Sequence, residues 1–229
     1  MKKVVVISGD IVAYTSLEDA EKTALEKQLK AFFIEMKKEY SVFARIVKGD
    51  FIEIVSENAE DALAIVLLVK SFIKSVSFSK NLENNRTKSF KNHGIRIAMG
   101  YGELSRYDAK KGIVDGEAIY LSGRKINEET THNKQRIVIK NTLFFVSTDE
   151  TLNYNMNTIL GLIDVLMSKA TSKQCEILYY KLLGLNEDAI AEKLKIRQSA
   201  VNQHSTNVGW NAIERAVKYF NFTFKEMKV

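Results

Sequence analysis

The sequence predicts an α+β protein in two parts, a region containing a β-sheet followed by an all-helical region. Over the first 150 residues, short β-branched runs alternate with helical apolar patterns in the order β-α-β-β-α-β. Residues 187–210 then read as two short helices joined by a tight turn. We therefore expect one domain over residues 1–150, a connecting helix over 151–168 and an all-α domain over 169–229.

The first region begins with a buried strand and an amphipathic helix. Val4–Ile7 is a continuous β-branched run, which is typical of a strand covered on both faces. It ends at Gly9-Asp10, and Thr15 followed by Glu18 offers a capping box for the helix. This helix is expected to bury the apolar side chains that share one of its faces: Leu25, Leu29, Phe32, Phe33 and Met36.

A hairpin and a second helix come next. Val42–Val47 and Phe51–Val55 are predicted strands, joined through Lys48-Gly49-Asp50. A strongly apolar helix is expected over residues 58–76, buried between layers. Residues 79–93 are polar and basic without periodicity, so they are predicted to be a loop.

The rest of the first region supplies another strand, a helix and a short final strand. Apolar residues alternate from Ile95 to Tyr101, with glycines leaving backbone room on one face. Ala118–Glu129 is predicted to be helical and Arg136–Ile139 to be a strand. This element order predicts a ferredoxin-like sheet backed by helices.

Five helical segments are predicted in the second part of the chain. The connecting helix, Asn153–Met167, is expected to bridge the domains and has a helical apolar pattern made by Ile159, Leu162, Ile163 and Leu166. Thr171 and Gln174 form a capping box for the next helix, which Gly184 ends. After the two short helices, Trp210–Phe220 is expected to close the domain.

Residues 187–210, EDAIAEKLKIRQSAVNQHSTNVGW, have the pattern of a helix-turn-helix. The apolar side chains of Glu187–Leu194 share one helical face, and small Ala191 lets two helices cross closely. The turn is expected at Lys195–Arg197. This stretch resembles the helix-turn-helix of bacterial regulators and of sigma-factor DNA-binding regions, although Lys195 stands where such turns often have Gly.

The second helix of this motif has an apolar and a polar side. Val201 and Val208 lie one heptad apart and are expected to face inward. The opposite arc then carries polar side chains that can hydrogen-bond to base edges. The predicted DNA-binding set is Lys195, Arg197, Gln198, Ser199, Asn202, Gln203 and Thr206. The alternative is a helical hairpin that only packs against its neighbours.

Charge and composition are compatible with this interpretation. From Lys169 onward there are 10 Lys and Arg against 6 Asp and Glu, so a modest basic excess lies with the helix-turn-helix. The start, MKKVVVISGD, has no secretory signal, and the longest apolar run, Ala62–Val69, is too short to span a bilayer. The single cysteine, Cys175, is expected to be a buried small hydrophobe. We expect a cytoplasmic protein with no membrane partner.

Two Gly-Asp pairs stand out in the first region: Gly9-Asp10 after the first strand and Gly49-Asp50 in the hairpin. In a ferredoxin-like sheet the first strand lies beside the strand that follows this hairpin, so both carboxylates could meet near one edge. Two carboxylates that close repel unless one is protonated or a cation lies between them. Asp10 and Asp50 are therefore candidate ligands of Mg²⁺ or Mn²⁺. The alternative is that both are ordinary turn residues.

These residues resemble the class III nucleotide cyclase catalytic domain. Asp10–Thr15, DIVAYT, is similar to its first metal motif, D-I-V-G-F-T, and Lys48–Phe51, KGDF, is similar to its second. Ile95–Gly102 resembles its R-hydrophobic-G strand. The resemblance implies that Asp10 and Asp50 hold the metals.

The nucleotide-reading part of that motif is incomplete. Asp115-Gly116 with Arg124 loosely resembles the stretch that supplies a base-reading Asp and a transition-state Arg, although a lone Arg on a helix is often merely solvated. Ile46 and Tyr120 stand where such cyclases have a base-reading Lys and a transition-state Asn. The interval between Asp115 and Arg124 is also two residues shorter than in that motif. Without these groups, stabilisation of the developing phosphate charge would be weak.

Most of the chain resembles the SatD family of bacterial proteins. The specific matches are Gly9-Asp10, Gly49-Asp50, Asp115-Gly116, Gln198–Val201 and Gly209-Trp210. The resemblance implies a cytoplasmic DNA-binding protein whose first domain has no firmly assigned activity. We expect a transcriptional regulator that binds double-stranded DNA as a homodimer, with a first domain that senses a nucleotide or mediates dimerisation. The alternatives are a metal-dependent nucleotidyl cyclase or transferase with a DNA-binding tail, and a first domain with a purely structural dimerisation role.

Overall fold

The computed structural model describes residues 2–76, 85–131, 139 and 141–227. Strands in this part of the chain are β1 (Lys3–Ile11), β2 (Val42–Lys48), β3 (Phe51–Ser56), β4 (Ile95–Asp108), β5 (Ile113–Gly116) and β6 (Leu143–Val146). The helices of the first 150 residues are η1 (Tyr14–Ser16), α1 (Asp19–Glu39), η2 (Ala59–Asp61), α2 (Ala62–Ser75), α3 (Asn85–His93) and α4 (Glu117–Thr131), where η marks a 3-10 helix. The later helices are α5 (Glu150–Lys169), α6 (Ser172–Leu182), α7 (Glu187–Leu194), α8 (Gln198–Asn207) and α9 (Trp210–Glu226).

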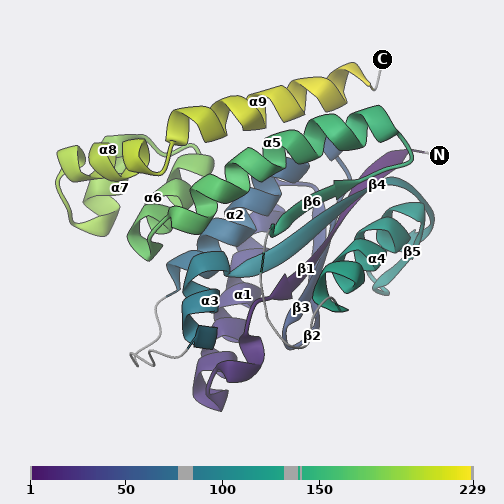
Figure 1. Ribbon diagram of the computed structural model, residues 1–229, viewed down its shortest axis with the longest axis horizontal. Coiled ribbons are helices and arrows are strands. Elements are labelled where there is room, and N and C mark those ends of the chain that lie inside the picture. Colours follow the sequence, from purple (N-terminus) through teal and green to yellow (C-terminus); the bar gives the residue numbers. More distant parts are fainter. Residues whose placement is uncertain (1, 77–84, 132–138, 140, 228–229) are drawn as a thin grey trace.

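The strands form one curled sheet, which confirms the mixed α+β class (Figure 1). Its order is β2-β3-β1-β4-β5, with antiparallel neighbours throughout, and β6 lies parallel to β4. The expectation that the first strand lies beside the strand after the hairpin is confirmed, because β1 pairs with β3. On its other side β1 pairs with β4, so β1 is central.

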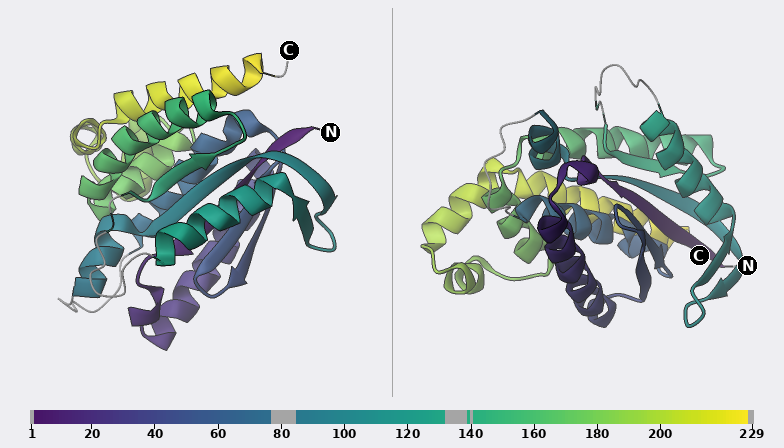
Figure 2. Two further views of the ribbon diagram at one scale, coloured as in Figure 1. Left: turned by 45° about the vertical axis from the view of Figure 1, so that its right-hand side comes forward. Right: turned by 90° about the horizontal axis from the view of Figure 1, so that it is seen from below.

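Helices cover both faces of the sheet (Figure 2). Val5 and Ile7 of β1 face the core that includes α1 and α2, whereas Val4 and Val6 face Ala118 of α4. This two-sided burial explains why β1 is a continuous apolar run rather than an alternating one.

The glycines of β4 leave the backbone room that the sequence suggested. A Cβ on Gly100 would lie 2.1 Å from the Ala118 carbonyl oxygen, so α4 can approach the strand only because no side chain stands there.

The start of α1 is a correction to the sequence analysis. The predicted capping box at Thr15 and Glu18 is wrong, because Thr15 lies in the 3-10 turn η1. Ala13 adopts a left-handed conformation (φ 57°) that turns the chain, and the helix begins only at Asp19. The capping box is formed instead by Glu18 and Glu21. The buried face of α1 contains the five predicted side chains, Leu25, Leu29, Phe32, Phe33 and Met36.

Other elements differ from the predictions in extent or type. The predicted loop over residues 79–93 is wrong for its second half, where α3 forms; its first residues lie outside the described part of the chain. Most of the predicted strand Arg136–Ile139 also lies outside the described residues, and Ile139 itself is in no strand. The strand that follows α4 in the described part of the chain is β6, Leu143–Val146. The sequence analysis did not predict β5.

The helical second part packs on α2. α6 and α9 both contact α2, and the Asn221 side chain of α9 donates to the Glu60 carbonyl oxygen of η2 at 3.4 Å. One hydrophobic core includes residues of both parts, from Val5 to Phe224. The predicted domain boundary near residue 150 stays a prediction. Within the apolar pattern of the connecting helix, Ile163 is buried but Leu162 is 68% exposed, because α5 buries a neighbouring arc. No helix in the described part of the chain is long and apolar enough to cross a membrane.

A buried lysine fastens α2 to α5. Lys70 is fully buried and donates to the Ile95 carbonyl oxygen (3.0 Å) and to Thr142 Oγ1 (2.5 Å), while its Nζ lies 3.6 Å from Asp164 Oδ1 on α5. Burial lowers the pKa of Lys70 to about 8, and the Asp164 carboxylate opposes this shift. Asp164 also accepts hydrogen bonds from the Thr142 backbone and hydroxyl. This network ties the sheet edge to the connecting helix.

Candidate functional site

The turn between α7 and α8 falls where the sequence placed it. Asn186 caps α7, its side chain accepting from the Ala189 N–H at 2.9 Å. Lys195 is left-handed (φ 52°), and the following Ile196 N–H donates to the Ala191 carbonyl oxygen at 3.0 Å. A non-Gly residue therefore holds the backbone conformation that glycine supplies most readily.

The two helices of the motif pack on α6 through a small core of their own. Its buried members are Ile177, Ile190, Ala191 and Val201. Val208 is also buried, at the end of α8, where it joins the main core. The prediction that Val201 and Val208 face inward is confirmed.

The polar arc of α8 and the turn before it face solvent. The exposed side chains include every member of the predicted DNA-binding set: Lys195, Arg197, Gln198, Ser199, Asn202, Gln203 and Thr206. By contrast, Ser205 is 3% exposed and its hydroxyl donates to the Asn202 carbonyl oxygen at 3.0 Å. The helix thus separates buried and exposed polar residues as its period requires.

Glu187 is a residue that the sequence analysis missed in this region. Its carboxylate accepts from Gln198 Nε2 and, at 3.3 Å, from Asn202 Nδ2, and it forms a 3.0 Å ion pair with Lys181. The hydrogen bond from Lys181 lowers the pKa of Glu187 and keeps it ionised. Each amide keeps a second N–H and its oxygen for another partner. Glu187 therefore contacts two of the predicted DNA-binding side chains, and its place on α7 gave no sign of this.

The second candidate region is a cavity of about 260 Å³ at the end of β1. Asp10 and Asp50 both line it, and the Ile11 N–H donates to the Asp50 carbonyl oxygen at 2.8 Å. The structure thus brings together the two carboxylates that the sequence singled out. The Tyr14 side chain packs closely on this turn, since a Cβ on Gly49 would lie 3.0 Å from the Tyr14 hydroxyl oxygen.

Arg96 of β4 is the residue that the sequence analysis missed in the cavity. It lies opposite Asp10 in the β1–β4 register, and its Nη2 is 2.6 Å from Asp10 Oδ2. Burial raises the pKa of Asp10, the Arg96 guanidinium opposes this shift, and the charge of Asp50 adds to it. A cation therefore already compensates Asp10, and it is a guanidinium from the chain itself.

The donor set does not fit a complete metal centre. Across residues 2–76, 85–131, 139 and 141–227, no three His, Cys, Asp or Glu side chains gather in a group that could hold a metal ion. Asp10 and Asp50 supply oxygen ligands of the type that Mg²⁺ prefers, but Arg96 occupies one of the Asp10 oxygens. A bound divalent ion at this site stays a prediction.

The predicted nucleotide-binding residues lie elsewhere in the chain. Asp115 is on β5, paired with the far end of β4, and accepts a hydrogen bond from the Tyr120 hydroxyl. Arg124 is exposed on α4 beside Tyr120. Neither Asp115 nor Arg124 lines the cavity of Asp10 and Asp50, so a single chain does not bring these four residues together.

Comparisons with known proteins add no further identification. No family model, no curated protein and no solved structure matches the chain.

Proposed function

We propose that this protein is a transcriptional regulator of the SatD type that binds double-stranded DNA through α8. The observation that carries the proposal is the arrangement of α7 and α8, in which the inward arc is buried and the seven predicted DNA-contacting side chains are all exposed. Asn and Gln side chains pair well with adenine edges in the major groove, and Lys195 and Arg197 suit phosphate contacts.

The pre-oriented amides support sequence-specific binding rather than general attraction to phosphate. Glu187 restrains Gln198 and Asn202 before any DNA arrives, so less side-chain freedom is lost on binding. A carboxylate at this place also repels phosphate, which disfavours a purely electrostatic role for the surface.

A homodimer is part of the proposal, since helix-turn-helix proteins commonly read two half-sites about 34 Å apart. In its support, α5 and α9 expose large apolar side chains that a second copy could cover: Tyr154, Leu162, Val165, Tyr219 and Phe222. The two helices lie side by side on one side of the molecule (Figure 1).

For the first domain we propose a ferredoxin-like, cyclase-related fold that senses a nucleotide or mediates dimerisation. The sheet order β2-β3-β1-β4 supports this fold. Arg96 supports a phosphate-bearing ligand, because its Nε is buried and has no hydrogen-bond partner among the described residues. A phosphate oxygen in the adjoining cavity would supply an acceptor.

The alternative, a metal-dependent nucleotidyl cyclase or transferase, rests on Asp10 and Asp50 lining one cavity. Against it stand Ile46, which packs against the core, and Tyr120, which is 61% exposed, at the positions of two catalytic side chains. Cyclic nucleotide formation near one turnover per second, a typical enzyme rate, would establish the alternative.

The DNA proposal is tested by selecting binding sites from a random duplex library and measuring affinity by fluorescence anisotropy across salt concentrations. We expect a near-palindromic site bound by two chains, shown by sedimentation of the complex. Lys195→Met and Arg197→Met should weaken binding to selected and random DNA alike and lower the salt slope by about one each. Lys218→Met on α9 removes the same charge and is the control. Failure to enrich any sequence, with Lys195→Met matching Lys218→Met, would contradict the proposal.

A further inference from the structure

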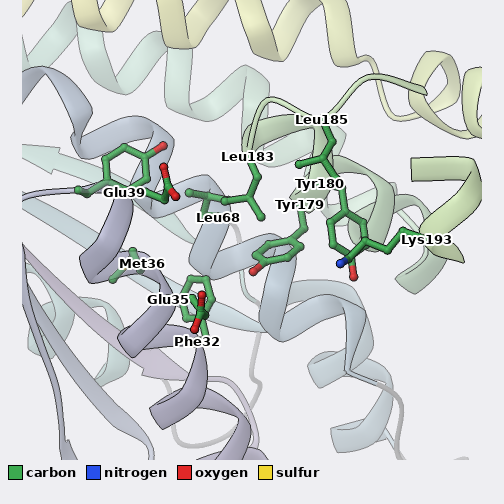
Figure 3. A pocket seen from close by; sticks show the side chains of 11 residues that line it. Phe32, Glu35, Met36, Glu39, Leu68, Tyr179, Tyr180, Leu183, Leu185 and Lys193 are labelled. Carbon is green, nitrogen blue, oxygen red and sulfur yellow. The ribbon is translucent and has the colours of Figure 1, made fainter. Parts of the chain in front are cut away.

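A cavity of about 320 Å³ lies between α1 and the α6–α7 segment, and its lining includes Met36 and Leu68 of the main core (Figure 3). α1 contributes Phe32, Glu35 and Glu39, and the α6–α7 segment contributes Tyr179, Tyr180, Leu183, Leu185 and Lys193. Its size falls within the range of small-molecule sites. Its walls therefore join the first domain to the predicted DNA-binding unit.

Aromatic rings form much of the cavity wall. The Tyr179 ring lies 6.0 Å from that of Phe32 and 5.2 Å from that of Tyr180, measured between centroids. Tyr180 also packs against the small core of α7 and α8. A ligand that contacts Tyr180 would thus contact a residue on which the helix-turn-helix rests.

Two carboxylates of α1 give the cavity negative charge. Glu35 pairs with Lys38 at 2.8 Å, but both side chains are more than 60% exposed, so solvent screens this pair. Glu39 has no ion pair within the described part of the chain. Burial raises the pKa of the Tyr179 hydroxyl, and the charges of Tyr180 and Glu35 add to the shift.

The chain places one of its own cations on this aromatic wall. The Lys193 ammonium of α7 lies 5.4 Å from the centroid of the Tyr180 ring, within cation–π distance. With two carboxylates and one ammonium, the cavity lining carries net negative charge, while the whole chain carries +6. This local reversal of charge favours a cationic ligand.

We infer that the cavity between α1 and α7 binds a small organic cation with an aromatic or apolar body, which competes with Lys193 for the Tyr180 ring. Rings and aliphatic side chains would enclose the body, and Glu35 and Glu39 would face the charge. Displacement of Lys193 would loosen α7 from α6. The binding site stands independently of the proposed function, whereas an effect on DNA affinity rests on it.

The test uses tetraphenylphosphonium and tetraphenylborate, two probes of nearly equal size and opposite charge, with the full chain in calorimetric titration without DNA. Because the chain is cationic, non-specific attraction favours the borate. We expect the phosphonium to bind and the borate to bind more weakly. Lys193→Met should tighten phosphonium binding about two- to fivefold by freeing the ring. Glu35→Gln with Glu39→Gln should weaken it by a similar factor.

Matched controls are Lys218→Met and Glu214→Gln on α9, which make the same charge changes away from the cavity. The melting temperature of each variant, measured without ligand, will show whether it folds like the wild type. Equal binding of the two probes, no phosphonium binding, or cavity variants that match the α9 controls would each overturn the inference. Anisotropy of labelled DNA with added phosphonium then tests the coupling alone. Probe binding without a DNA effect would leave the site established and reject the coupling.

Discussion

The helix-turn-helix and the aspartate cavity were both suggested by short motifs, yet they are built differently. The exposed arc of α8 comes from residues within one turn and one helix, so the helical period alone decides which side chains face solvent. The cavity is built from strand ends that are far apart in sequence; Asp10 and Arg96 are 86 positions apart. A local motif therefore identifies a local surface, whereas a cavity needs the register of the sheet.

This difference has a chemical consequence. In the helix-turn-helix, the missed residue, Glu187 of α7, accepts hydrogen bonds from two α8 side chains that the sequence had already singled out. In the cavity, the missed residue, Arg96, changes the charge balance. Its guanidinium supplies a positive charge beside Asp10, so the two carboxylates depend less on a bound metal ion. The following predictions separate these two situations, from the largest expected effect to the smallest.

Removing Arg96 should have the largest effect on stability. Arg96→Met leaves Asp10, whose side chain is 17% exposed, without its cation, and should lower the free energy of unfolding by about 2 kcal/mol at neutral pH. The pKa of Asp10 is already above its usual 3.8 and would rise further. The folded variant then holds its proton more tightly than the unfolded chain, so the deficit is small below pH 3.8 and grows as pH rises.

Urea unfolding at several pH values measures this deficit. Asp10→Asn in the Arg96→Met background removes the uncompensated charge and should recover most of the loss. A deficit that does not change with pH, or no recovery in the double variant, would show that Arg96 acts through packing instead.

Ala13 and Lys195, non-Gly residues that both have left-handed backbone conformations, give a matched pair of substitutions. Ala13→Gly beside the cavity and Lys195→Gly in the turn should each raise the free energy of unfolding by about 1 kcal/mol, since both have positive φ. Only Lys195→Gly should also weaken DNA binding, by loss of a phosphate contact. If both variants, or neither, alter DNA affinity, Lys195 has no role distinct from its backbone conformation.

Divalent metal should give the smallest effect. Mg²⁺ or Mn²⁺ should raise the melting temperature of the wild type slightly, because Arg96 competes for Asp10. Asp10→Asn should abolish the rise and Arg96→Gln should enlarge it, each variant being compared with its own metal-free melting curve. An unchanged melting temperature in all three proteins would mean that Asp10 and Asp50 hold no metal.

Much of the fold could be predicted from the sequence because its signals are local. The buried face of α1, the capping box of α6 and the turn at Lys195 follow from spacing within a few residues. The predicted start of α1 was wrong because a left-handed Ala13 and a 3-10 turn precede the helix, and neither has a strong sequence signature. Leu162 of the connecting helix is exposed because α5 buries a neighbouring arc, which includes Asp164 paired with Lys70 of α2; which arc is buried depends on such long-range partners.

Reading of base edges by α8 is the central part of the proposed function. The decisive measurement compares Asn202→Ala with the wild type on selected and random DNA, by anisotropy at one salt concentration. Asn202 is exposed and its bond to Glu187 is long (3.3 Å), so the fold should be unaffected. We predict a loss of about 1–3 kcal/mol on the selected site and little change on random DNA. An equal loss on both, or none on either, would contradict the assignment of α8 as the recognition helix.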